Sequence, residues 1–257
     1  HQKELSPRLR ANPDAKLEAR VEEEEYMKKQ TPEYLAEVER LAAQSEPMNP
    51  ACKVAICIPV AGHQEVNNIE RTLSSYLNQT IDKDTFELVL FVNQPDLSPR
   101  GEKIKSDGTL DRIEKFKKEH PELNIRVMQS VIPIRDARIG NVRKMLSDAT
   151  LARSLKRQGN DDLIMVSNDA DLKGVSPEYV KNFVEKFEKE PQTDAFMGQL
   201  DWDPEAYIRN PLNHIGTRLF QYISVQHRKA NRGIESSGAN FAYRASTYAA
   251  IGGYNTR

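Results

Sequence analysis

The sequence predicts an α/β domain whose mostly parallel central sheet is flanked by helices, with a helical region before it. From residue 51 onward, short apolar runs alternate with amphipathic stretches, which is the pattern of successive β-α-β units. The apolar runs have strand length, and a chain of 257 residues is long enough to bury a large core. We expect strands at 54–58, 86–92, 125–129, 163–166 and 195–200.

The first 50 residues differ from the rest, because charged residues dominate 14–44. Thr31 followed by Pro32 is typical of a helix start, where the first side chain caps the helix and proline fits the first turn. Apolar residues then recur at helical spacing. We therefore predict an N-terminal helical appendage, 1–50, and a catalytic domain, 51–257. The apolar residues of the appendage helix are Leu35, Val38, Leu41 and Ala42.

Each gap between the expected strands carries a stretch with apolar residues at helical spacing. Helices over these stretches would bury one side against the sheet. The last stretch, near 211–228, begins at a proline. In chain order, the apolar residues are Ile69, Leu73 and Tyr76; Leu110, Ile113 and Phe116; Val142, Leu146 and Ala149; Val180, Phe183 and Phe187; and Leu212, Ile215 and Leu219.

Composition and charge exclude several classes of function. Lys and Arg number 37 against 38 Asp and Glu, so no net field attracts nucleic acid. The longest apolar run, 54–62, is too short to cross a membrane, and the polar N-terminus lacks the apolar core of a secretory signal. Cys52 and Cys57 are five positions apart, and in a strand this odd offset would place them on opposite faces. We expect a cytoplasmic protein, with peripheral attachment at the inner face of a membrane as the alternative.

Loops that follow strands are the first candidates for a site, because ligands of open parallel sheets bind beyond the carboxyl ends of the strands. Pro59, Val60 and Ala61, with Glu65 further along, lead from the first strand toward a helix, so their backbone can line a nucleotide pocket. Asn93 follows the second strand, and its amide can pair with the edge of a base. Ordinary turns explain both loops nearly as well.

A third loop places two carboxylates directly after an apolar strand, in the order Asn168, Asp169, Ala170, Asp171. Carboxylates buried without partners are costly. A hard cation such as Mn²⁺ or Mg²⁺, held by one or two carboxylates and by substrate phosphates, offsets that cost. It would act as a Lewis acid on a departing diphosphate. The alternative is a turn with two exposed acids, because Asp-x-Asp often occurs by chance.

Four segments carry a resemblance to a known family: 58–80, the stretch from Arg138 to Arg143, the Asp169-Ala170-Asp171 motif, and 238–254. In residues and in order they resemble glycosyltransferase family 2, whose members are inverting enzymes with a GT-A fold that use nucleotide-diphosphate sugars. The resemblance implies a GT-A fold for 51–257.

The resemblance also implies the roles of the donor-side residues. Asp169 and Asp171 would hold the metal, with Asn168 beside them, and Arg143 and Arg138 would approach the diphosphate. A UDP-sugar is the favoured donor and a GDP-sugar the alternative. The acceptor would be a saccharide, a lipid-linked group or another hydroxyl compound.

Two departures separate the chain from the family pattern. The aspartates that usually read the nucleobase are replaced by Asn93, Gln94 and Pro95, and the polar stretch 96–106 has the character of an inserted loop. The acidic motif that carries the catalytic base in the family has no room before Arg257. We therefore expect a truncated chain whose base lies beyond Arg257.

The acceptor side is predicted from residues after the fifth strand. Trp202 can stack on a sugar, and the neighbouring Asp201 and Asp203 can orient its hydroxyls, although an ordinary strand end explains them as well. Gly238 would border the same side, and Glu235 is the fallback base.

Other functions remain open at this stage. They are a retaining transferase, a sugar-phosphate nucleotidyltransferase, which would need a Gly-rich triphosphate loop that 58–65 lacks, and a non-catalytic GT-A-like binding module.

Overall fold

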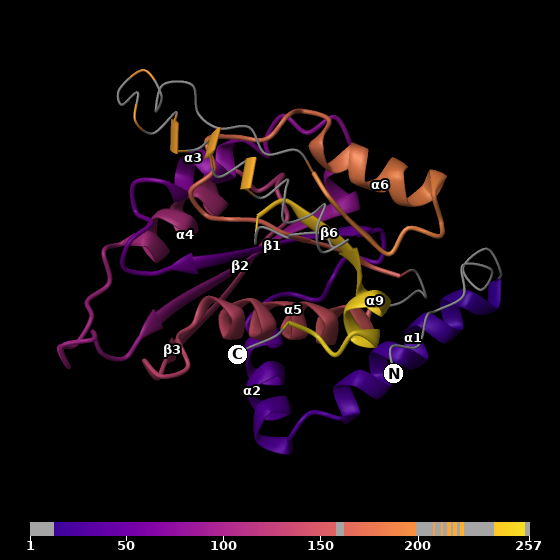
Figure 1. Ribbon diagram of the computed structural model, residues 1–257, viewed down its shortest axis with the longest axis horizontal. Coiled ribbons are helices and arrows are strands. Elements are labelled where there is room, and N and C mark those ends of the chain that lie inside the picture. Colours follow the sequence, from indigo (N-terminus) through magenta and orange to yellow (C-terminus); the bar gives the residue numbers. More distant parts are fainter. Residues whose placement is uncertain are drawn as a thin grey trace.

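A six-stranded sheet lies at the centre of the computed structural model, which describes residues 13–157, 162–198 and 239–254 together with 208, 212, 215–216, 218–219 and 222–223. The strand order is β3-β2-β1-β4-β6-β5 (Figure 1). β1 to β4 run parallel, and β6 runs antiparallel to both of its neighbours. The strands are β1 (Val54–Ala61), β2 (Phe86–Pro95), β3 (Ile125–Ile132), β4 (Ile164–Ser167), β5 (Ala195–Met197) and β6 (Phe241–Arg244).

Helices cover both faces of this sheet, which confirms the predicted α/β class and is consistent with a GT-A-like arrangement. α3, α4 and α6 pack on one face, and α5 and α9 pack on the other together with α1 and α2 (Figure 1). The helices are α1 (Pro13–Lys28), α2 (Pro32–Ala42), α3 (Ile69–Ser74), α4 (Thr109–Glu119), α5 (Ile139–Lys156), α6 (Tyr179–Lys189) and α9 (Ala245–Ala250), and a 3-10 turn, Lys83–Thr85, precedes β2.

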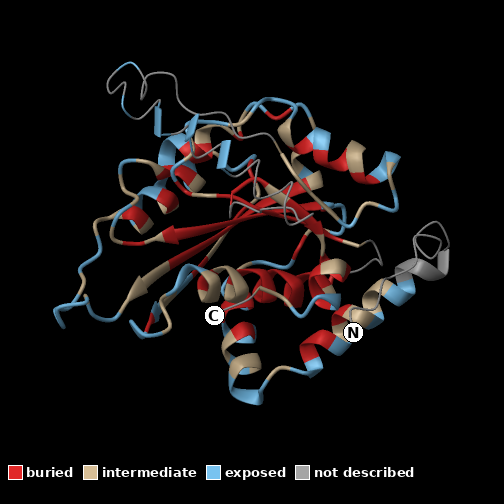
Figure 2. Ribbon diagram, in the orientation of Figure 1, coloured by how far each residue is buried: buried red, intermediate tan, exposed pale blue. Residues whose placement is uncertain are grey.

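β1 shows why a continuous apolar run suits the centre of this sheet. Successive strand residues point to opposite faces, and both faces are covered by helices. Val54, Ile56 and Ile58 accordingly join the core under α3 and α6, while Ala55 and Cys57 join the core under α5. Figure 2 shows that burial is concentrated on the sheet and on the sides of the helices that face it.

Cys52 and Cys57 depart from the expected arrangement. Both are buried, both are free thiols, and both belong to the same core cluster rather than to opposite faces. The reason is that Cys52 lies before the first residue of β1, so strand alternation does not apply between them.

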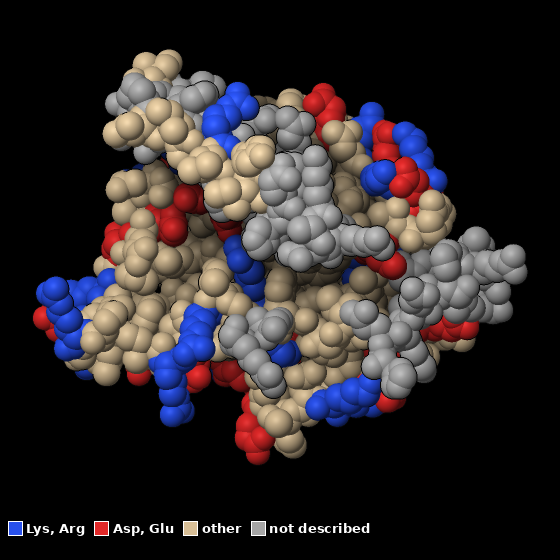
Figure 3. Space-filling model, viewed as in Figure 1, with Lys and Arg blue, Asp and Glu red and all other residues tan. Residues whose placement is uncertain are grey.

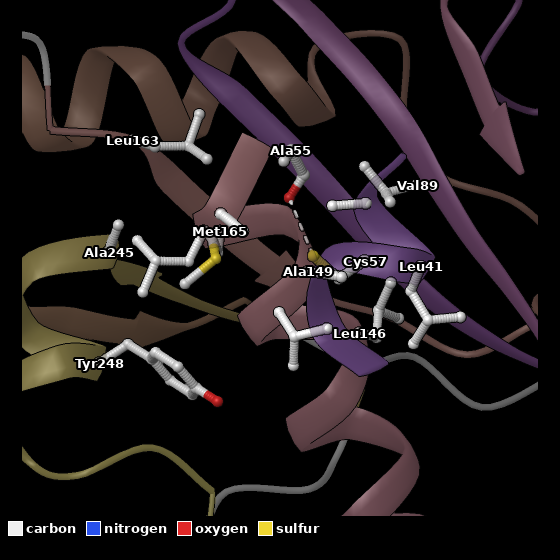
Figure 4. Packing of buried hydrophobic residues seen from close by; sticks show 14 of the residues in the cluster. Leu41, Ala55, Cys57, Val89, Leu146, Ala149, Leu163, Met165, Ala245 and Tyr248 are labelled. Carbon is white, nitrogen blue, oxygen red and sulfur yellow. Dashed lines mark hydrogen bonds between the residues drawn. The ribbon is translucent and has the colours of Figure 1, made fainter. Parts of the chain in front are cut away.

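The first described residues pack against the sheet domain. Thr31 caps α2 through its side chain, as predicted, and Pro32 opens the helix. Val38 and Leu41 of α2 have no exposed surface and lie in one core cluster with residues of β1, β2 and α5. Figure 4 shows Leu41 in this cluster with Cys57. The two N-terminal helices therefore cover part of one face of the sheet.

The last two elements predicted from apolar patterns are only partly described. β5 ends at Met197, and 199–200 lie outside the described residues. The described residues between 208 and 223 are helical, as expected for 211–228. Leu212, Ile215 and Leu219 are exposed there, at 74%, 63% and 57%.

The charge distribution on the described surface agrees with the near-equal numbers of basic and acidic residues in the sequence (Figure 3). On the face shown in Figure 3, outside the grey atoms, basic and acidic side chains are interspersed without a large area of one sign. None of the helices in the described part of the chain combines the length and the apolar content that a membrane crossing requires.

Candidate functional site

A cavity of about 550 Å³ opens where the parallel strands end. Because β1 to β4 run the same way, the loops that follow them meet at one edge of the sheet. Each of these four loops lines the cavity, which therefore has the position predicted for a ligand site. The lining residues are Pro59, Ala61, His63, Gln64 and Glu65; Asn93, Pro95, Leu97, Pro99 and Ile104; Ile134, Ala137, Ile139 and Val142; and Asp169, Ala170 and Asp171.

The loop after β1 is held close to β2. Gly62 N donates to Asn93 O at 2.9 Å. A Cβ at Gly62 would stand 3.0 Å from Val92 Cγ1, so this close approach favours glycine. Glu65 lines the cavity, and its carboxylate accepts a hydrogen bond from Asn68 Nδ2 at 3.1 Å, just before α3. Val60 is buried in the core.

Asn93 has a fixed orientation at the cavity wall. Its Nδ2 donates to Val60 O at 3.0 Å and to Phe91 O at 3.3 Å. Both carbonyls accept only, so they assign the nitrogen to the strand side. The carbonyl oxygen of the side chain is then the group that Asn93 presents to a ligand.

The stretch 96–106 forms the outer wall of the cavity. Asp96 Oδ1 accepts from Leu97 N and from Ile134 N, both at 2.8 Å, which joins this stretch to the loop after β3. Gln94 Nε2 donates to Ile104 O at 2.7 Å and closes its far end. Although the stretch 96–106 is mostly polar in sequence, the side chains that it places in the cavity wall are apolar: Leu97, Pro99 and Ile104.

Asn168 sits beneath the acidic loop and is 1% exposed. Its Nδ2 donates to Tyr76 Oη at 2.8 Å and to Tyr179 Oη at 3.0 Å, and Tyr179 in turn donates to Asn240 Oδ1 at 2.8 Å. Burial raises the pKa of both tyrosine hydroxyls, so they stay protonated. Asn168, predicted beside the donor, thus ties the acidic loop to α6 and to the start of β6.

The backbone of the acidic loop is held by α3. Thr72 Oγ1 donates to Ala170 O at 2.7 Å, and Arg71 Nη2 donates to Asp171 O at 3.2 Å. With the backbone fixed in this way, Asp169 and Asp171 both line the cavity.

Arg143, near the start of α5, contacts the first of these acids. Its Nη2 lies 2.8 Å from Asp169 Oδ1, and the two side chains are 16% and 39% exposed. Arg138 is the N-cap residue of the same helix and is exposed. Ile139, the first residue of α5, lines the cavity. The positive end of the helix dipole therefore lies at the cavity and favours an anion there.

The two carboxylates have donor atoms that suit a hard divalent cation. Within 13–157, 162–198 and the other described positions, no group of three or more His, Cys, Asp or Glu side chains could hold an ion. Asp169 and Asp171 supply hard oxygen ligands at the cavity. They fit Mg²⁺ or Mn²⁺ when a bound diphosphate completes the coordination shell.

The remaining predicted residues cannot be placed. Asp201, Trp202, Asp203, Glu235, Gly238 and the end of the chain at Arg257 lie outside the described residues. His63 and Gln64, which lie within the predicted loop 59–65, also line the cavity. The structure adds the apolar wall, for which apolar residues such as Leu97 and Ile104 within a polar stretch were the only sequence signal.

No protein-family model and no curated protein matches the chain. TarS of S. aureus, residues 1–349, in complex with UDP is 19% identical, with a TM-score of 0.41 over 58% of this chain and 36% of that chain. The mannosyltransferase PcManGT from Pyrobaculum calidifontis, in complex with GDP-Man and Mn²⁺, is 18% identical, with a TM-score of 0.42 over 76% of this chain and 47% of that chain. The chain thus spans less than half of either neighbour, and this similarity is too low to transfer a function.

Proposed function

We propose that the chain is the donor-binding part of a glycosyltransferase that moves a sugar from a nucleotide diphosphate to a hydroxyl acceptor. The observation that carries this proposal is the cavity at the carboxyl ends of β1 to β4, which Asn93, Asp169 and Asp171 all line. It offers a hydrogen-bond acceptor, an apolar wall and a pair of carboxylates, which are the groups that a nucleoside diphosphate needs.

The nucleoside would lie between the loops that follow β2 and β3. Leu97, Ile104 and Ile134 provide apolar surface there, and Asn93 offers its side-chain oxygen. An acceptor oxygen can pair with the ring N–H of uracil or guanine, and equally with the exocyclic amino group of cytosine or adenine. The choice of a UDP-sugar as donor, with a GDP-sugar as the alternative, therefore rests on the family resemblance of the sequence and not on Asn93.

The diphosphate would lie between the start of α5 and the acidic loop. Arg143 and the exposed Arg138 would meet its oxygens, because a guanidinium can bind phosphate through two parallel hydrogen bonds. Asp169 and Asp171 would hold Mn²⁺ or Mg²⁺, which when bound supplies Lewis-acid stabilisation of the leaving diphosphate.

The reaction would be a direct displacement with inversion at the anomeric carbon. The acceptor would approach from the side of Asp201, Trp202, Asp203 and Gly238, with Glu235 as the candidate base. The acceptor would be a saccharide, a lipid-linked group or another hydroxyl compound. We place the enzyme in the cytoplasm, with attachment at the inner face of a membrane as the alternative.

The test is calorimetric titration of UDP and GDP with and without Mn²⁺. In the Asp169→Asn/Asp171→Asn variant we expect metal-dependent binding to weaken at least tenfold, about 1.4 kcal/mol, because the carboxylates that would hold the cation are neutralised. Asp111→Asn is the matched control, since Asp111 is exposed on α4 and lies outside the cavity. Wild-type protein that binds neither nucleotide under any condition would reject the proposal.

A further inference from the structure

Arg143 and Asp169 form an ion pair in the place where the proposed function requires two other contacts. Arg143 Nη2 donates to Asp169 Oδ1 at 2.8 Å. The proposed function assigns the guanidinium to the diphosphate and the carboxylate to the cation. The pair occupies Asp169 Oδ1 and one Arg143 donor, so a cation that binds this carboxylate through both oxygens has to displace Arg143.

The surroundings show that this pair can be exchanged. Asp169 is 39% exposed and borders the cavity, so a cation can reach it. Arg143 Nε is buried and has no hydrogen-bond partner among the described residues, so the guanidinium uses only part of its donor capacity on Asp169. Arg143 does not itself line the cavity, so its side chain would have to turn toward the cavity before a phosphate oxygen could use these donors.

Charge balance explains why the exchange would need both ligands. A cation that came alone would have to displace Arg143 and then sit beside its positive charge. A diphosphate that came alone would draw Arg143 away and leave two carboxylates, Asp169 and Asp171, beside its own negative charge. When both arrive, each charge has an opposite partner.

We propose that Arg143 holds the cation position at Asp169 until a donor binds, and that it moves to the diphosphate when the cation takes the carboxylate. This inference rests on the function proposed above. Its consequence is positive coupling, in which the nucleotide raises the affinity for the metal and the metal raises the affinity for the nucleotide by the same factor. Arg143 is then the residue that keeps the metal site closed without a donor.

The test is an electron paramagnetic resonance titration of Mn²⁺ into wild type and Arg143→Gln, with and without UDP, corrected for Mn²⁺ bound by UDP alone. Arg143→Gln should bind Mn²⁺ without UDP at least about 5-fold more tightly than wild type, the lower end of typical coupling factors. The enhancement by UDP should fall by a similar factor. Arg135→Gln is the matched control, because it removes the same charge from a side chain that is 85% exposed and pairs with Asp136.

The outcomes separate this inference from the proposed function. If wild type binds UDP and Mn²⁺ together but Arg143→Gln binds Mn²⁺ alone no better than wild type, the exchange is overturned and the donor site stands. An equal gain in Arg135→Gln also overturns it, because general charge would then be the cause. If wild type shows no joint binding, the donor site and the exchange both fail.

A second measurement uses the wild-type protein, so it does not require the Arg143→Gln variant to bind UDP as wild type does. The side-chain Nε–H signal of Arg143 can be followed by NMR in wild type, after assignment with Arg143→Lys. It should shift when UDP and Mg²⁺ are added together, and should change little with Mg²⁺ alone. A signal that stays in place in the ternary complex overturns the exchange.

Discussion

Single side chains outside the cavity set the position of the acidic loop, and Asn168 is the clearest case. Its side-chain amide donates hydrogen bonds to Tyr76 and Tyr179. The residue is 1% exposed and directly precedes Asp169. Replacement by leucine keeps the volume but removes both hydrogen bonds. Buried polar groups that lose a partner cost about 1–3 kcal/mol.

We therefore expect Asn168→Leu to lower the free energy of unfolding by about 1–3 kcal/mol and to weaken the binding of UDP with Mn²⁺. Urea unfolding and calorimetry measure the two effects. The control is Asn182→Leu, because Asn182 is exposed on α6. Unchanged unfolding together with unchanged binding would contradict the positioning role of Asn168.

Among the elements, α1 buries an ionisable side chain. Glu23 is 5% exposed, and burial raises its pKa to about 8, with Asp162 adding to the rise and Arg157 and Arg20 opposing it. Glu24 of the same helix also raises it. The folded protein therefore holds a proton that the unfolded chain releases near the ordinary value of 4.5.

The sign of the pH dependence follows from this difference. Between pH 4.5 and about 8 the folded state binds more protons at Glu23, so this group lowers the stability as the pH rises through that window. Glu23→Gln has no such term. Its gain in unfolding free energy over wild type should be small below pH 5 and largest above pH 8, at about 1.4 kcal/mol for each unit of pKa shift. Denaturant unfolding at several pH values measures it, and a difference independent of pH would disprove the burial of a protonated Glu23.

At the scale of the whole molecule, the sequence predicted the parts that follow from local patterns. The strands at the centre of the sheet are continuous apolar runs, and the loops after them carry Asn93, Asp169 and Asp171, so both the sheet edge and its polar residues were predictable. β6 lies within the resembling segment 238–254, but no apolar pattern predicted a strand there. The apolar cavity wall and the burial of Asn168 depend on contacts between distant segments, which a local pattern does not contain.

The packing of the two N-terminal helices against the sheet domain was likewise not predictable from local patterns. Their charged sequence favours a separate appendage, yet Asp148 of α5, which has no exposed surface, accepts hydrogen bonds from Tyr26 at 2.9 Å, Tyr34 at 2.7 Å and Tyr248 at 2.8 Å. Lys144 Nζ lies 2.6 Å from the same carboxylate. One buried acid thus joins α1, the start of α2, α5 and α9, which no helix pattern predicts.

This packing leads to a prediction about the boundary at residue 50. The side chains of Tyr26, Met27, Val38, Leu41 and Met48 are buried in the core cluster. Burying one such apolar side chain contributes about 1.5–3 kcal/mol, and the net stability of a whole domain is only about 5–15 kcal/mol. The stabilisation lost with these five side chains would therefore be similar to the whole net free energy of unfolding of the domain.

We expect a chain of residues 51–257 to lose cooperative thermal unfolding, measured by circular dichroism, while the full chain keeps it. Within the full chain, Leu41→Ala should lower the free energy of unfolding by about 2–5 kcal/mol. Leu17→Ala is the control, because Leu17 is 58% exposed on α1 and its truncation removes little buried surface. A shortened chain that unfolds cooperatively near the full-length midpoint would show that 1–50 is a separable appendage, and the contacts of Leu41 would then be dispensable for the fold.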